Sequence, residues 1–139
     1  MPIISNNLTE VRAGVQALCQ DFPPEYWREL DKTYGYPTEF VETLTRAGYL
    51  GVLIPREYGG SGLGLQTVGV ILEEVCRSGG HPGTCHAQMY TMGTLLRHGS
   101  IAQKQRYLPD IAAGLLRLQA FGVTEPEAGT DFIASLSRT

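Results

Sequence analysis

The residues best suited to chemistry lie in the segment from Phe121 to Asp131. Thr124 and Thr130 flank a turn in which Pro126 fixes one backbone angle, and Gly129 allows a positive φ or a close approach to a ligand. The two hydroxyls and the neighbouring backbone N–H groups can donate hydrogen bonds to the edge of a ring system and to a pyrophosphate. The segment therefore predicts a turn that holds a phosphate-bearing cofactor.

The run before this turn has the composition of a short apolar strand, with Leu118, Ala120, Phe121 and Val123. The carboxylates of the turn would repel a phosphate, because an ionised carboxylate only accepts hydrogen bonds. Asp131 is therefore expected to accept backbone N–H bonds that hold the turn, and Glu125 to pair elsewhere in the protein.

Three segments together resemble the acyl-CoA dehydrogenase family. Residues 122–134, GVTEPEAGTDFIA, are similar to its flavin-loop signature, residues 48–62 to its loop after the second helix, and residues 98–109 to its helix before the β-domain. Their order and spacing agree, and the resemblance covers about residues 37–131. It implies a mainly α fold: an N-terminal helical bundle over residues 1–116, then the first strand and flavin loop of a middle β-domain, truncated, over residues 117–139.

The resemblance also implies an activity. In the family, a carboxylate removes the α-proton of an acyl-CoA thioester and a hydride passes from the β-carbon to N5 of FAD, which gives a trans-2-enoyl-CoA. By analogy Val123 and Thr124 would bond the pyrimidine edge of the flavin, and Thr130 would meet the pyrophosphate and lie near the substrate. An electron-transfer flavoprotein or similar acceptor and a homo-oligomer are expected as partners. The cofactor-binding residues implied are Phe121, Gly122, Val123, Thr124, Gly129 and Thr130.

The same resemblance assigns no catalytic residue to this chain. The family's base is a glutamate in a C-terminal helical domain, and its second flavin contact is a Trp-x-Thr/Ser segment, both expected beyond Thr139. After the signature, Ser135 stands where the family has an apolar residue, and Leu136 comes one place late. We therefore expect an inactive fragment with a truncated, frameshifted or irregular end. A non-catalytic helical remnant that binds a partner, or an acyl-CoA oxidase-like relative, is the alternative.

Helical periodicity dominates the rest of the sequence. Apolar stripes and capping residues predict helices over residues 9–20, 37–47, 65–78 and 84–98, and over 100–114 with a break at Pro109. Residues 25–36 read as an irregular connection, and residues 49–64 as a buried extended piece followed by a glycine-rich structural turn.

The helix at 84–98 carries two faces of different character. Met89, Met92, Leu95 and Leu96 form an apolar face. His86, Tyr90 and Thr94 recur at intervals of four residues on another face. These side chains either lie at the surface, as amphipathic residues commonly do, or line the acyl-chain pocket that the family resemblance places on this helix.

Composition excludes several classes of protein. A chain of 139 residues can bury one core, and a net charge of -3 with 18% charged residues argues against nucleic acid as a partner. No apolar run is long enough to span a bilayer, and the N-terminus has no targeting signal. Three cysteines are too few for a disulfide framework, so a cytoplasmic protein is expected.

Two further polar groups in the sequence have simple explanations. Cys76, His81, Cys85 and His86 match no structural zinc spacing, so no metal is expected. Lys104 and Arg106 are cations on a polar helix, which is more often a solvated face than a site for the CoA phosphates.

Overall fold

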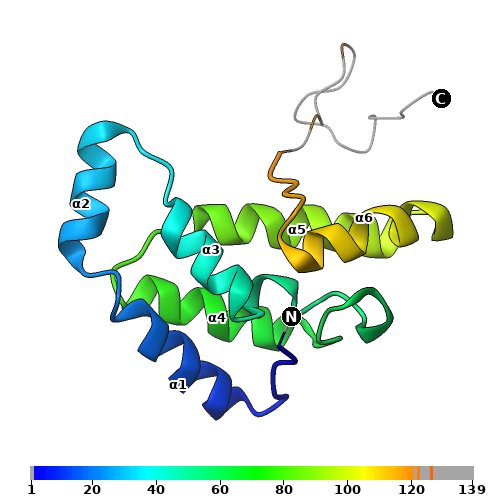
Figure 1. The fold of residues 1–139 in the computed structure, drawn as a ribbon, viewed down its shortest axis with the longest axis horizontal. Helices are drawn as coiled ribbons and strands as arrows, with labels where there is room; N and C mark the ends of the chain where they lie inside the picture. Colours follow the sequence, from blue (N-terminus) through cyan, green and yellow to red (C-terminus); the bar gives the residue numbers. More distant parts are fainter. Residues whose placement is uncertain (1, 121, 123–125, 127–139) are drawn as a thin grey trace.

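The computed structural model describes residues 2–120, 122 and 126, and within these residues the chain is helical (Figure 1). The elements are α1 (Leu8–Cys19), α2 (Pro24–Thr33), α3 (Thr38–Arg46), two short 3-10 helices η1 (Tyr49–Gly51) and η2 (Arg56–Tyr58), α4 (Leu65–Arg77), α5 (Gly83–His98) and α6 (Ile101–Ala113). Figure 1 shows α1 and α4 on one side of the bundle and α5 with α6 on the other, with α3 crossing between them. In the described part of the chain no helix is long and apolar enough to cross a membrane.

Local signals explain where several helices begin and end. Asn7 caps α1 by accepting hydrogen bonds from the backbone N–H groups of Thr9 and Glu10. At the start of α6, Ser100 and Gln103 form a reciprocal capping box. Gly48 follows α3 at φ 91°, a conformation that strains any residue with a Cβ. The helices predicted at 9–20, 37–47, 65–78 and 84–98 are thereby confirmed.

Two apolar clusters form the core. The larger one joins α1, α3, α4 and η1, with Phe40, Leu44, Leu50 and Ile71 fully buried. The second cluster lies between α5, α6 and the chain after η1 and comprises Ile54, Met92, Leu108, Ile111 and Ala112. Leu116 and Leu118, which follow α6, pack against this second cluster. These contacts therefore hold the chain that leads toward residue 122 against the end of the helical bundle.

The irregular connection predicted for residues 25–36 is wrong, because most of it is helix α2. Pro24 occupies the first turn of α2, where its missing N–H costs nothing. Tyr26, Trp27 and Leu30 give α2 one apolar side, but none of them is fully buried, and the other residues of the helix are mainly polar. Aromatic edge contacts of Tyr26 and Trp27 with Phe22 and Phe40 hold it against the bundle.

Three further expectations also differ from the structure. The apolar piece after Gly48 is buried, but it begins as the 3-10 helix η1 rather than as an extended strand, and the 3-10 helix η2 that follows has no buried residue. Helix α6 continues through Pro109, because only one backbone hydrogen bond is lost there and Leu108 and Ile111 remain buried on either side. Residues 116–120 form no strand, since no neighbouring extended segment among the described residues pairs with them.

Candidate functional site

Most of the predicted cofactor-binding residues lie outside the described residues. These are Phe121, Val123, Thr124, Gly129 and Thr130. Gly122 is described and exposed, and a Cβ placed on it would meet no heavy atom of the described residues within 4 Å.

The chain that leads to Gly122 is fixed by polar contacts to the helices. We call residues 115–120 the connector. Arg117 Nη1 donates to Thr45 Oγ1 on α3 at 3.1 Å and to Gln88 Oε1 on α5 at 3.4 Å. Gln119 Nε2 donates to the backbone oxygen of Thr84 at 3.0 Å. Sequence analysis did not single out either connector side chain, because no motif contains them.

His86 and Tyr90 lie one turn apart on α5, as their spacing predicts. Their rings meet edge to face, with centroids 5.1 Å apart and an interplanar angle of 67°. His86 is exposed and Tyr90 is half-buried, whereas Cys85 and Met89 on the opposite side of the helix are buried. The predicted division of α5 into an apolar and an amphipathic face is confirmed.

Part of this amphipathic face lines a hollow. Tyr90 and Thr94 border a cavity of about 480 Å³, together with Leu53, Leu65 and Arg97. Leu53 and Leu65 give it apolar walls, and Tyr90 and Thr94 each carry a hydroxyl. His86 does not border this cavity. The hollow therefore has a mixed polar and apolar lining, with Tyr90 and not His86 on its wall.

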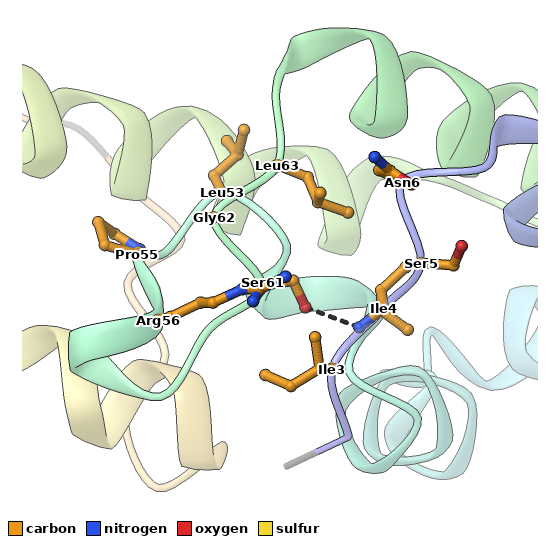
Figure 2. A pocket seen from close by; sticks show the side chains of 10 residues that line it. All are labelled: Ile3, Ile4, Ser5, Asn6, Leu53, Pro55, Arg56, Ser61, Gly62 and Leu63. Carbon is orange, nitrogen blue, oxygen red and sulfur yellow. Dashed lines mark hydrogen bonds between the residues drawn. The ribbon is translucent and has the colours of Figure 1, made fainter.

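A larger hollow of about 760 Å³ lies where the N-terminal segment passes the loop after η1 (Figure 2). The backbone N–H of Ile4 donates to Ser61 Oγ at 2.9 Å and ties the two segments together. The described residues that the sequence assigned to cofactor or substrate do not line it. We therefore leave it out of the candidate site.

The cysteine and histidine side chains of the rejected metal site are scattered in the structure. Cys76 is exposed on α4, while Cys85 is buried at the start of α5, where burial raises the pKa of its thiol to about 11. His81 Nδ1 accepts a hydrogen bond from the backbone N–H of Gly83 at 3.2 Å. Among the described residues no group of three or more His, Cys, Asp or Glu side chains is arranged to hold a metal ion.

With this geometry in place, comparison with known proteins assigns the family. The family model described as "Acyl-CoA dehydrogenase, N-terminal domain" matches residues 5–115. The chain belongs to the acyl-CoA dehydrogenase family. Within that family its described helices correspond to the N-terminal helical domain, so the predicted fold class is confirmed.

Individual relatives agree with this assignment. The chain is 31% identical over 130 residues to the acyl-CoA dehydrogenase FadE12 of Mycobacterium tuberculosis, covering 93% of this chain and 33% of that protein. It is 30% identical over 135 residues to the mitochondrial isovaleryl-CoA dehydrogenase of Pongo abelii, covering 94% and 32%. The chain thus spans about a third of the length of these relatives.

Solved structures of the family share the fold. The butyryl-CoA dehydrogenase of Megasphaera elsdenii superposes with a TM-score of 0.71 at 28% identity, over 93% of this chain and 36% of that one. A glutaryl-coenzyme A dehydrogenase in complex with glutaryl-CoA gives a TM-score of 0.75 at 29% identity, over 96% and 35%.

Proposed function

We propose that the chain forms the N-terminal helical domain and flavin loop of an FAD-dependent acyl-CoA dehydrogenase, which oxidises an acyl-CoA thioester to a trans-2-enoyl-CoA. The observation that carries the proposal is the family match over residues 5–115, followed at once by the signature at residues 122–134. Bound FAD would supply the hydride acceptor.

The threonines of the signature have distinct proposed roles. The Thr124 hydroxyl and the Val123 backbone would donate to the pyrimidine edge of the flavin, where negative charge accumulates on reduction. Thr130 would bond the pyrophosphate, and Gly129 would let the backbone approach it without a Cβ in the way. Phe121 and Gly122 would pack beneath the ring.

The amphipathic face of α5 is proposed to contact the acyl chain. Tyr90 supports this role because it borders the 480 Å³ hollow beside the apolar side chains of Leu53 and Leu65. His86 would act from one turn earlier, through its edge contact with the Tyr90 ring. Changing either side chain would then alter which acyl chains are accepted, through the size and polarity of the pocket.

Titration of the 139-residue protein with FAD tests the proposal, with flavin fluorescence as the signal. We expect saturable binding with a Kd of about 10⁻⁵ to 10⁻⁴ M, because the family's second flavin contact lies in a separate segment. Thr124→Val should weaken binding by up to about tenfold, the effect of one lost hydrogen bond. Thr33→Val, the same change at an exposed site on α2, is the matched control and should have no effect. Absence of saturable binding, or equal affinities of the two variants, would contradict the proposal.

A non-catalytic helical module that binds a protein partner is the alternative. The observation that favours it is the presence of large apolar side chains at the surface, among them Leu65 at 75%, Ile101 at 73% and Leu115 at 80% exposure. Apolar side chains of this kind mark contacts with other protein segments where they lie together in one patch. This alternative predicts self-association or partner binding that FAD does not influence.

The family assignment also supports more general expectations about partners and location. An acyl-CoA substrate, an electron-transfer flavoprotein as acceptor and assembly with further copies are proposed partners. One similar structure, with a TM-score of 0.78 at 29% identity, comes from work on the electron transferring flavoprotein of Acidaminococcus fermentans. A cytoplasmic location is proposed because the three cysteines carry free thiols.

A further inference from the structure

The connector, residues 115–120, has alternating side-chain directions. Leu116 and Leu118 pack against the second apolar cluster. Arg117 and Gln119 instead reach α3, α5 and the segment before α3. Side chains at alternate positions of an extended chain point to opposite sides, so the connector is held from both sides at once.

The Arg117 contacts are prearranged by the helices. Its two acceptors, Thr45 and Gln88, are 6% and 1% exposed. Thr45 Oγ1 also donates to the backbone oxygen of Val41 at 2.6 Å, and Gln88 Nε2 donates to the backbone oxygen of Leu50 at 3.4 Å. Each acceptor is thus oriented by a second bond, and the guanidinium meets a fixed pair of oxygens.

Placing the charged side chain of Arg117 at this position carries an unfavourable desolvation free energy. Arg117 is half-buried, and within the described residues neither of its acceptors is a carboxylate. Removing a guanidinium from water is unfavourable unless its donors are bonded in good geometry. Both hydrogen bonds come from one terminal nitrogen, Nη1, so a single nitrogen of the guanidinium joins oxygens on two different helices.

Gln119 provides a second point of attachment two residues later. Its Nε2 donates to the Thr84 backbone oxygen at 3.0 Å and lies 3.1 Å from the Tyr36 hydroxyl, which in turn lies 3.3 Å from Gln119 Oε1. Gln119 therefore links the connector to the start of α5 and to the approach to α3. Three residues later the chain reaches Gly122.

We propose that Arg117 is a positioning residue that, with Gln119, fixes the direction in which the chain leaves the helical bundle and enters the flavin loop. This inference rests on the proposed function, because it assigns Arg117 an effect on FAD that acts through the connector rather than by contact. Freed from Thr45 and Gln88, the connector would sample many directions, and the loop would bind FAD only in a fraction of them.

The test compares Arg117→Met with Arg28→Met, the same change at an exposed arginine of α2. Two quantities are measured on the 139-residue protein: the rate of chymotrypsin cleavage after Leu116 or Leu118, mapped by mass spectrometry, and the affinity for FAD. We expect Arg117→Met to speed cleavage and weaken FAD binding, each on the order of tenfold. Arg28→Met should change neither, and Arg117→Lys should restore part of both.

Several outcomes would overturn the inference. Cleavage and affinity that stay at wild-type values in Arg117→Met would remove the positioning role. Weaker FAD binding with unchanged cleavage would instead mean direct contact with the cofactor. If Arg117→Met does not fold, Thr45→Val, which removes one acceptor with little change in shape, must reproduce both effects. If the wild-type chain binds no FAD, the proposed function is refuted. The cleavage rates would still show whether Arg117 holds the connector in place.

Discussion

Raising the pH from 8 to 10 should destabilise the protein through a single buried thiol. Cys85 is fully buried at the start of α5, and burial raises the pKa of its thiol from 9.0 to about 11. In the unfolded chain the thiol loses its proton near its ordinary pKa, whereas in the folded chain it keeps the proton for about two more pH units. The stabilising contribution is therefore complete below pH 9 and is lost as the pH rises toward 11.

The size of this effect follows from the two pKa values. A shift of two units corresponds to roughly 3 kcal/mol in the free energy of unfolding once both states are ionised. Between pH 8 and pH 10 the loss amounts to about 1 kcal/mol, because the unfolded thiol is then mostly ionised and the folded one is not.

Urea denaturation at pH 8, 9 and 10 with a reductant present measures this loss. Cys85→Val is the control, because it removes the titrating group while lysine and tyrosine titrations remain common to both proteins. The difference between the two unfolding free energies should shrink by about 1 kcal/mol over this pH range. A difference that stays constant to within about 0.3 kcal/mol would refute the reasoning, since the variant's altered packing contributes only a pH-independent offset.

Three substitutions test the local signals that shape the bundle, each by urea denaturation followed by far-UV circular dichroism. Gly48→Ala should lower the free energy of unfolding by about 2 kcal/mol or more, because φ is 91° and the new Cβ would lie 2.7 Å from the backbone oxygen of Pro2. A loss below about 0.5 kcal/mol would contradict this expectation. Ser100→Ala should lower the free energy of unfolding by about 1 kcal/mol, because it removes the side-chain acceptor for the Gln103 N–H. An unchanged midpoint of urea denaturation would show that the capping box contributes nothing to stability. Pro109→Ala should stabilise the protein by about 1 kcal/mol, since the exposed site regains a helical N–H donor, and destabilisation would mean that the ring itself matters.

Helix α3 illustrates what the sequence could predict. Its apolar stripe of Phe40, Val41 and Leu44 repeats with helical spacing, and all three side chains are fully buried. The glycine after it provides the left-handed residue that the chain needs to turn away. Where burial and capping are encoded within one turn of the helix, the pattern alone defines the element.

Helix α2 illustrates what a pattern misses. Its apolar side, Tyr26, Trp27 and Leu30, is only partly buried, and the helix is held by contacts with rings elsewhere in the chain, such as the edge contact of Trp27 with Phe40 at 4.8 Å between centroids. A window of neighbouring residues carries no information about such a partner. A strand likewise requires a second strand beside it, and residues 118–120, the described beginning of the strand expected at 118–123, have none among the described residues.

The candidate site likewise contains some features that the sequence predicts and others that it does not. The four-residue spacing of His86 and Tyr90 predicts a shared helix face, and their rings are indeed in contact. The Arg117 contact joins residues separated by 72 positions, and the Gln119 contact with Tyr36 spans 83. Neither pair belongs to a periodic pattern or a family signature, so only the folded arrangement reveals them.

The choice of partners for Arg117 has a consequence for the conditions under which the protein works. A threonine hydroxyl and a glutamine amide do not change charge near neutral pH, and contacts between a cation and neutral dipoles respond weakly to added salt compared with ion pairs on the surface. The attachment of the connector should therefore stay intact through acidification or a rise in ionic strength, while the exposed ion pairs of α2 and α4 weaken.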